Sequence, residues 1–465
     1  MKMNFIKKYA LAKMLRYASH QSDESIIKMI NIANKYFIKS EKVRWEAEKI
    51  RRIFVEHHPG ATLAKNAFSR ISKQSLNSVI QNFFINAAVI GRQRQEQLRK
   101  ELNIWIPWFF VISPTAKCNL TCVGCYAGNY NKEEDLSYEL VDRILNEAKD
   151  LGIYFITVSG GEPFMWPHLL DIFEKHHDMF FQIYTNGTMI TKEIANRLGK
   201  LGNAAPAISI EGFEKETDLR RGEGTFKKIM EAMDNLYEAG VPFGFSATPT
   251  KNNIDILMSD EFIDLMIDKG CLLGWYFQYV PIGRRPDVSL MATPEQRFEL
   301  RKRSIEIRNT KPIFIGDFWN DGPYVGGCIC GARQAGYFHI NCRGDVEPCV
   351  FLQFSVDNIK DKKLIDVIQS PFFKAFQEAQ PYRENNNLLT PCALIDNPHI
   401  LRDIVTKYNA KPSYNSCMDV INNPEITSFL DNYSKEYQKL VDPIWENELK
   451  LKLKYKTWKE RWIHD

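Results

Sequence analysis

The chain has 465 residues, of which 44% are hydrophobic, 25% charged and 12% aromatic. This ordinary globular composition excludes a disordered chain, a collagen-like fibre and a small disulfide-held scaffold, and the length suits about three domains. The 61 Lys and Arg residues nearly balance the 57 Asp and Glu residues, so the net charge of +4 gives no indication of nucleic-acid binding.

Residues 1–105 are predicted to be helical. Ser22 is a candidate N-cap, and the apolar residues behind it recur at helical spacing up to Phe37. The first 20 residues mix basic and apolar side chains in an amphipathic pattern. We expect a helical cap on the next domain, with contact to a membrane surface as the alternative. The Lys-rich stretch Leu449–Trp462 has similar alternatives: a solvated helix face, or binding to a partner or a membrane.

No secretory signal sequence is apparent, and no apolar run approaches the roughly 18 residues that a membrane-spanning helix needs. We therefore expect a cytoplasmic protein, with peripheral membrane contact as the open alternative. Thiols stay reduced in the cytoplasm, so the ten cysteines are expected to bind metal or to serve redox chemistry rather than to form disulfides.

Short apolar runs alternate with helical patterns between residues 106 and 290. Strands are predicted at 109–112, 155–158, 181–184, 207–210, 243–246 and 275–278. One of the intervening helices is expected to begin after Ser137 as N-cap. The alternation indicates βαβ units and a parallel sheet, either as a partial barrel or as a doubly wound sheet. In both arrangements functional groups gather at the carboxyl ends of the strands.

Beyond residue 290 the chain becomes rich in glycine and cysteine. A helix is predicted to begin at Thr293-Pro294, and a hairpin is predicted from 337–340 and 345–347. We therefore expect three parts: a helical extension (1–105), an α/β core (106–290) and a small cysteine-rich α+β domain with a helical tail (291–465).

Cys118, Cys122 and Cys125 follow the first predicted strand with the spacing Cys-x3-Cys-x2-Cys. Three thiolates can hold three corners of a cubane cluster and leave the fourth iron open to a small molecule. A structural zinc site is the alternative, but it needs a fourth Cys or His, and none follows within roughly the next forty residues. The second predicted strand ends in Gly160-Gly161-Glu162-Pro163, where paired glycines allow a ligand to approach the backbone closely.

With these two motifs at neighbouring strand ends, the chain resembles the radical S-adenosylmethionine (radical SAM) enzymes. That family has a partial (β/α)6 barrel, similar to a TIM barrel, and a [4Fe-4S] cluster whose open iron binds S-adenosylmethionine. The resemblance implies that Cys118, Cys122 and Cys125 ligate the cluster. The cofactor-binding residues that it implies are Gly160, Gly161, Glu162, Pro163, Thr185, Asn186, Ser209 and Arg221. For Arg221 a surface ion pair is the alternative. Gly124 is a departure, since the family often has an aromatic residue before the third cysteine.

Six cysteines lie beyond the predicted barrel, and Gly344-x4-Cys349 sits in the predicted hairpin. This region resembles the SPASM or shortened twitch extension of radical SAM enzymes, which holds one or two auxiliary iron–sulfur clusters. The dense cysteine run of a full SPASM domain is missing, so one auxiliary cluster is expected. The implied ligands are Cys330, Cys349 and Cys392, with Cys328, Cys417 or Cys342 as the fourth. A zinc site or ordinary buried cysteines are the alternatives.

The resemblance implies an enzyme that reductively cleaves S-adenosylmethionine and abstracts hydrogen from a substrate through a 5′-deoxyadenosyl radical. A peptide or protein is the expected substrate, and a one-electron reductase such as flavodoxin or ferredoxin is the implied partner. A radical SAM enzyme acting on lipid or acyl chains and a non-catalytic iron–sulfur or zinc scaffold are the alternatives. No Ser-His-Asp set or carboxylate pair is evident, so no other catalytic residue is predicted.

Overall fold

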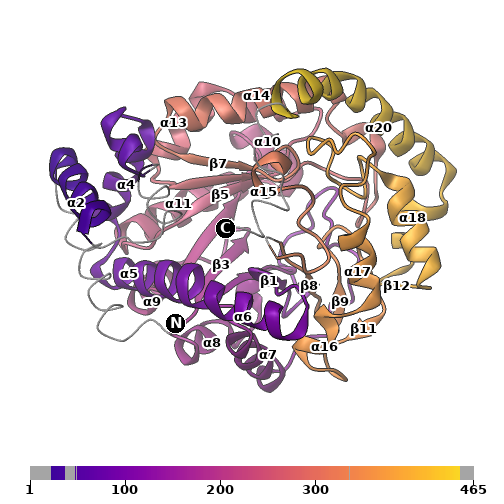
Figure 1. Cartoon of the computed structure of the whole chain (residues 1–465), viewed down its shortest axis with the longest axis horizontal. Helices are drawn as coiled ribbons and strands as arrows, with labels where there is room; N and C mark the ends of the chain where they lie inside the picture. The colour runs from indigo at the N-terminus through magenta and orange to yellow at the C-terminus, as the bar shows by residue number, and fades with distance from the viewer. Residues whose placement is uncertain (1–21, 37–47, 49, 335, 451–465) are drawn as a thin grey trace.

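The structure, a computed structural model, describes residues 22–36, 48, 50–334 and 336–450. Its centre is a ten-stranded sheet with the order β11-β9-β8-β1-β2-β3-β4-β5-β6-β7 (Figure 1). Its strands are β1 (Phe109–Ile112), β2 (Phe155–Val158), β3 (Phe180–Thr185), β4 (Ala204–Ser209), β5 (Gly244–Ala247), β6 (Leu273–Tyr276), β7 (Phe314–Asp317), β8 (His339–Ile340), β9 (Asp345–Glu347) and β11 (Asp357–Asn358). A smaller sheet pairs β10 (Phe354–Ser355) with β12 (Lys411–Pro412).

Strands β1 to β7 run parallel, and each pairs with the next along the chain. The segments between them form α7 (Tyr138–Asp150), η2 (Pro163–Met165), α8 (Leu169–Lys175), α9 (Lys192–Leu201), α10 (Glu214–Arg221), α11 (Thr225–Glu238), α12 (Ile254–Leu257), α13 (Asp260–Asp268), η3 (Val288–Leu290) and α14 (Pro294–Thr310). The six predicted strands are confirmed to within three residues at their ends, and the predicted α/β partial barrel is confirmed with them. All four residues of β2 are buried, as expected of a parallel strand with both faces covered.

Helix starts follow the predicted capping chemistry. The Ser137 side chain accepts the N–H of Leu140 at the start of α7. Thr293 forms a capping box with Gln296 at the start of α14, where Pro294 occupies the first helical position. These side chains satisfy backbone N–H groups that have no partner within the helix.

Both flanks of the predicted barrel are extended by strands from beyond residue 290. Strand β7, which sequence analysis missed, adds to β6. The predicted hairpin is present as β8 and β9, and β8 pairs in parallel with β1 through Val111 and His339. The cysteine-rich region is therefore continuous with the barrel sheet, whereas the boundary at residue 290 stays a prediction.

The described part of the N-terminal region is helical, as predicted. Its elements are α2 (Asp23–Tyr36), α4 (Pro59–Arg70), α5 (Lys73–Ser78), η1 (Val79–Gly91) and α6 (Arg92–Leu102). Phe83 of η1 packs on Phe155 and Phe180, with ring centroids 5.4 and 5.7 Å away. Phe155 and Phe180 begin β2 and β3, so η1 packs at the amino ends of these strands, away from the cysteine loop. The basic amphipathic pattern in the first 20 residues lies outside the described residues.

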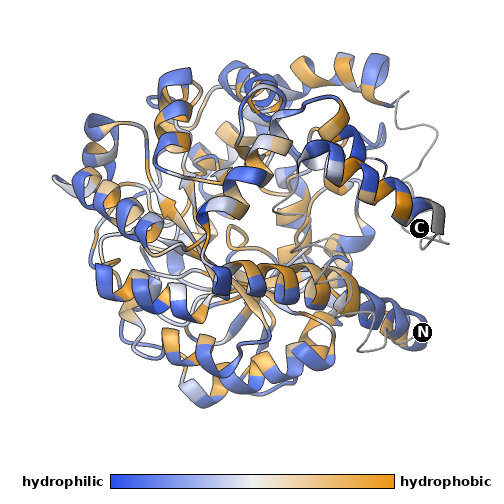
Figure 2. Cartoon of the chain, turned by 90° about the vertical axis from the view of Figure 1, so that its left-hand side faces the viewer, coloured by the Kyte–Doolittle hydropathy of each residue, from blue (hydrophilic) through white to orange (hydrophobic). Residues whose placement is uncertain are grey.

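The C-terminal part is mainly helical. Its elements are α15 (Gly322–Val325), α16 (Leu364–Ile368), α17 (Pro371–Glu378), α18 (Pro398–Lys407), η4 (Asn415–Met418), α19 (Asp419–Asn422), α20 (Pro424–Ile444) and η5 (Trp445–Leu449). The helices carry both hydrophilic and hydrophobic residues, blue and orange in Figure 2. No described helix combines the length and the apolar character that crossing a bilayer requires. The Lys-rich stretch at 449–462 lies outside the described residues from position 451 onward.

Candidate active site and cysteine clusters

The cysteine loop and the Gly-Gly-Glu-Pro segment lie side by side at the carboxyl ends of β1 and β2. The N–H of Gly161 donates to the carbonyl of Thr115 at 2.9 Å, and that of Glu162 donates to Lys117 at 2.7 Å. A Cβ on Gly161 would lie 2.1 Å from the Lys117 carbonyl oxygen, and Gly160 has a φ of +132°. Both positions therefore require glycine for the two segments to meet.

Glu162 joins this pair of segments to the end of β3. Its carboxylate is fully buried and accepts hydrogen bonds from the Thr185 hydroxyl and the Asn186 N–H, both at 2.7 Å. Burial raises the pKa of Glu162, although these hydrogen bonds favour its ionised form. Asn186 in turn reaches the Cys118 sulfur with its side-chain amide, at 3.9 Å. The structure thus brings Glu162, Thr185 and Asn186 together beside the cysteine loop, while Pro163 begins the short helix η2.

Arg221 forms a buried ion pair rather than a surface one. Its guanidinium donates to Glu211 at 2.5 Å, and its side chain is 10% exposed. Burial alone would lower the pKa of Arg221, but Glu211 and the nearby Cys122 and Cys125 thiols raise it above the ordinary value. Arg221 therefore lies between a carboxylate and the cysteine loop. Ser209, at the end of β4, lies with its hydroxyl 3.3 Å from that of Ser246 on β5.

Gly124, the residue before the third cysteine of the loop, lies against a residue that is remote in sequence. A Cβ on Gly124 would lie 2.5 Å from the Tyr279 ring, and Gly124 has a φ of +63°. Tyr279, which follows β6, therefore supplies an aromatic ring beside this position. Sequence analysis missed Tyr279 because no local pattern links it to the loop.

The three cysteines of the loop are half-buried and lie close enough to affect one another. Burial raises the pKa of Cys118 and Cys125, and neighbouring thiols of the loop raise it further. Sulfur atoms also accept backbone N–H groups from the residue two positions on: Leu120 for Cys118, at 3.4 Å, and Ala127 for Cys125. Bound cations relieve such crowding of thiolates, and N–H···S bonds are typical of iron–sulfur ligands.

Four of the later cysteines come together from separate segments. The Cys328 thiol lies close enough to the other three to affect them. It raises the pKa of Cys330, and it adds to the larger effect of burial, which raises the pKa of Cys349 and Cys392. The N–H···S pattern recurs here, from Phe351 to Cys349 at 3.5 Å and from Leu394 to Cys392 at 3.3 Å.

Cys342 and Cys417 lie apart from these four, and both interact electrostatically with Glu347. The N–H···S bond from the residue two positions on is not found at either cysteine. The structure therefore separates these two cysteines from the set that includes Cys328.

Within the described residues, no three His, Cys, Asp or Glu side chains converge closely enough to hold a single metal ion. A zinc ion would draw its thiolates onto one atom, whereas a cubane spreads them over several irons. The thiolate donors of both sets are the ligands that an iron–sulfur cluster takes.

The structure contains a buried Ser-His-Glu network that is not evident in the sequence. The Ser113 hydroxyl lies 2.7 Å from His339 Nε2, and His339 Nδ1 lies 2.6 Å from Glu347. Glu347 also accepts hydrogen bonds from Tyr130 and Asn341, and all these residues are buried. Sequence analysis missed the network because it forms only where β8 joins β1.

These features define a class of protein: a partial barrel whose strand ends carry a three-cysteine loop, with a second cysteine set on the same sheet. A family model described as the radical SAM superfamily matches residues 112–263. A second model, SPASM, described as an iron-sulfur cluster-binding domain, matches residues 328–397.

Relatives of known name cover much of the chain. Mycofactocin maturase MftC of Mycolicibacterium smegmatis is 30% identical over 287 residues, which are 58% of this chain and 70% of that protein. The AdoMet-dependent heme synthase of Methanosarcina barkeri is 24% identical over 299 residues, 58% of this chain and 82% of that protein.

Solved structures share the fold. Streptococcus suis SuiB bound to the precursor peptide SuiA has a TM-score of 0.50 at 20% identity, covering 60% of this chain and 68% of SuiB. Native anSMEcpe with bound AdoMet has a TM-score of 0.50 at 16% identity, covering 70% of this chain and 99% of anSMEcpe.

The chain belongs to the radical SAM superfamily and carries a SPASM domain. It is accordingly an enzyme that uses a [4Fe-4S] cluster and S-adenosylmethionine, with auxiliary iron–sulfur binding in the SPASM domain.

Proposed function

We propose that this enzyme modifies a peptide or protein substrate at the carboxyl end of its barrel. The observation that carries the proposal is the pairing of β8 with β1, which adds the SPASM hairpin to the barrel sheet. Because of this pairing, the segment that contains Cys349 contacts the segment that contains Cys125. Tyr126 and Phe351 make that contact, with ring centroids 5.5 Å apart.

Half-buried aromatic residues at strand ends offer the substrate an apolar surface. Tyr184 is the next-to-last residue of β3, Phe277 follows β6 and Phe318 follows β7. Their rings form a chain, with Tyr184 and Phe277 centroids 5.3 Å apart and Phe277 and Phe318 likewise 5.3 Å apart. Apolar and aromatic side chains with few polar groups are typical of ligand-binding sites.

The printed names of two of the matched proteins support the same substrate class, whereas that of the heme synthase does not. MftC is a maturase, and SuiB was solved with a precursor peptide. The lipid alternative rests on the basic chain ends and on the aromatic-rich segment 105–110. The ends lie largely outside the described residues. In the aromatic segment, Trp108 and Phe109 pack on Phe155, with ring centroids 5.2 and 5.7 Å away, so the lipid alternative is not proposed. We extend the proposal to a one-electron donor such as flavodoxin or ferredoxin as the redox partner.

In this proposal Cys118, Cys122 and Cys125 hold the [4Fe-4S] cluster, and Cys328, Cys330, Cys349 and Cys392 hold one auxiliary cluster. The bound cluster and S-adenosylmethionine supply the radical chemistry that abstracts hydrogen from the substrate. The residues of the chain position the cofactor. Gly160, Gly161 and Pro163 shape the backbone beside it, and Arg221 and Ser209 contribute polar groups. Glu162, Thr185 and Asn186 fix the end of β3 beside the cysteine loop.

The test compares the wild type with a variant in which Cys118, Cys122 and Cys125 are all replaced by Ala, after anaerobic reconstitution. We expect about eight irons in the wild type and about four in the variant, and 5′-deoxyadenosine from the wild type alone after adding dithionite and S-adenosylmethionine. No iron uptake by the wild type would contradict the proposed ligands.

The substrate class is tested with cell extract. Extract from the source cells should stimulate 5′-deoxyadenosine formation, and treating the extract with a protease should abolish the stimulation. Stimulation that survives protease and partitions into organic solvent would support the lipid alternative instead.

A further inference from the structure

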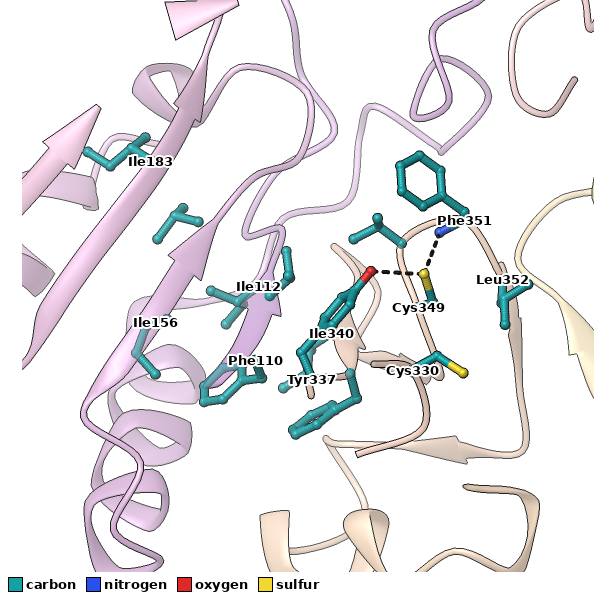
Figure 3. Packing of buried hydrophobic residues seen from close by; sticks show 14 of the residues in the cluster. Phe110, Ile112, Ile156, Ile183, Cys330, Tyr337, Ile340, Cys349, Phe351 and Leu352 are labelled. Atoms are coloured by element: carbon teal, nitrogen blue, oxygen red, sulfur yellow. Dashed lines mark hydrogen bonds between the residues drawn. The ribbon is translucent and has the colours of Figure 1, made fainter. Parts of the chain in front are cut away.

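Two tyrosine hydroxyl groups lie against the sulfur atoms of the four-cysteine set. The Tyr337 hydroxyl is 2.8 Å from the Cys349 sulfur (Figure 3), and the Tyr382 hydroxyl is 3.6 Å from the Cys330 sulfur. A tyrosine hydroxyl carries its proton at neutral pH, so both hydroxyls can donate a hydrogen bond to a thiolate sulfur.

A buried guanidinium lies beside the same cysteines. Arg333 is only 2% exposed, and it donates to the carbonyl of Cys328 at 2.8 Å and to the side chain of Gln380 at 2.7 Å. Another hydrogen bond goes to the carbonyl of Val325 at 2.9 Å. Since Arg stays protonated in proteins, a positive charge is held next to the thiolates.

The charge of an iron–sulfur cluster becomes more negative by one unit when the cluster is reduced. A fixed positive charge and hydrogen bonds to sulfur stabilise the reduced form more than the oxidised form, so they raise the reduction potential. Burial acts in the opposite direction, because a low-dielectric surrounding disfavours the more highly charged form. Arg333, Tyr337 and Tyr382 therefore oppose the effect of the buried surroundings.

We propose that Arg333, together with the hydroxyls of Tyr337 and Tyr382, raises the reduction potential of the auxiliary cluster so that it accepts one electron readily. The inference rests on the proposed function, since it assumes that the four cysteines bind a cluster. Arg333 and the two tyrosines are positioning residues for the potential and are not ligands.

The experiment uses the full-length Cys118→Ala/Cys122→Ala/Cys125→Ala protein, in which only the auxiliary cluster forms. An EPR-monitored redox titration gives its midpoint potential. We expect Arg333→Met to lower the ratio of reduced to oxidised cluster about tenfold at a fixed solution potential, a shift of about 59 mV for one electron. Tyr337→Phe, which removes only a hydroxyl group, should shift the potential in the same direction by a smaller amount.

Two controls separate charge from structural damage. Arg333→Lys keeps the positive charge and should keep most of the potential. Arg402→Met removes an arginine whose guanidinium pairs with Asp431, and it should leave the potential unchanged. If Arg333→Met cannot bind the cluster, the midpoint potentials of Tyr337→Phe and Arg333→Lys test the inference instead.

Three outcomes overturn the inference. The first is an unchanged potential in both Arg333→Met and Tyr337→Phe with full iron content. The second is an Arg333→Lys shift as large as that of Arg333→Met, which would show that charge is not the cause. The third is the absence of iron in the parent triple variant. That result would overturn the proposed ligands first, and the inference would fall with them.

Discussion

Gly161 is constrained by space alone, since the Cβ of any other residue would meet the Lys117 and Ala116 carbonyl oxygens at 2.1 and 2.5 Å. These neighbours are backbone atoms, so they cannot move aside as a flexible side chain would. We expect Gly161→Ala to lower the free energy of unfolding by about 1–3 kcal/mol and to reduce iron binding by the cysteine loop.

Urea unfolding of the apoprotein and iron analysis measure the two effects of Gly161→Ala. Gly60→Ala is the matched control, because Gly60 lies at the start of α4 and its nearest neighbour, at 3.1 Å, is a side-chain atom of His58. Equal stability of the Gly161 variant and the wild type would show that the two segments can separate without cost.

Asp317, at the end of β7, gives a pH dependence. It is fully buried, and burial followed by the nearby Asp321 raises its pKa to about 6. The folded state therefore favours the protonated form, so the stability it contributes is lost as pH rises from about 4 to about 6. As the pH rises between these values, we expect the free energy of unfolding of Asp317→Asn to increase by about 2–3 kcal/mol relative to that of the wild type.

Unfolding of the apoprotein in urea at pH 4.5 and at pH 7 measures this difference for both proteins. The free energy of unfolding of Asp317→Asn, compared with that of the wild type, should be higher at pH 7 than at pH 4.5. A difference that stays constant with pH would show that Asp317 is ionised in the folded protein over the whole range.

At the scale of elements, the hairpin β8–β9 is stabilised by the barrel rather than by itself. Its strands have only two and three residues, too few for an independent hairpin in water. Pairing with β1 and the buried contacts of His339 supply the stability that the hairpin lacks by itself. We expect the hairpin to unfold in one cooperative unit with β1 and β2.

Native-state hydrogen exchange tests this expectation. Amides of the hairpin, such as that of Ile340, should show the same opening free energy as those of Phe110 and Val111 in β1. His339→Gln should reduce protection in both elements. Exchange of the hairpin at much lower free energy than β1 would instead make the SPASM region a separate folding unit.

At the scale of the whole molecule, a buried ion pair joins the barrel to the C-terminal region. Arg297 of α14 pairs with Asp396 at 2.5 Å, both fully buried, and the Tyr437 ring of α20 lies against the guanidinium. Asp396 also accepts the N–H of Cys392 at 3.0 Å. The pair therefore fixes one proposed cluster ligand to two helices.

Removing one partner of this pair should be costly, because the other charge would stay buried without compensation. We expect Asp396→Leu to destabilise the protein by about 3–5 kcal/mol and to lower auxiliary iron content, and Arg297→Met/Asp396→Leu to recover much of the stability. Thermal unfolding and iron analysis measure both. Arg402→Met, which removes one partner of the more exposed Arg402–Asp431 pair, should cost much less.

The sequence by itself determined the α/β class, the six strands of the barrel, the helix caps and the family. These features are local: apolar runs, capping residues and cysteine spacing act over a few neighbouring positions. Cys118, Cys122 and Cys125 share one loop, so their proximity follows from spacing. The Gly160-Gly161 pair likewise required no knowledge of distant residues to be recognised as a close-approach segment.

The tertiary structure alone decided the contacts between distant segments. It placed β8 beside β1, brought Cys349 and Cys392 to the Cys328–Cys330 segment, and set the Tyr279 ring against Gly124. It also assembled Ser113, His339 and Glu347 into one hydrogen-bonded set. Such contacts depend on which strand edges and apolar faces remain to be covered once the barrel forms, and no local pattern in the chain records that competition.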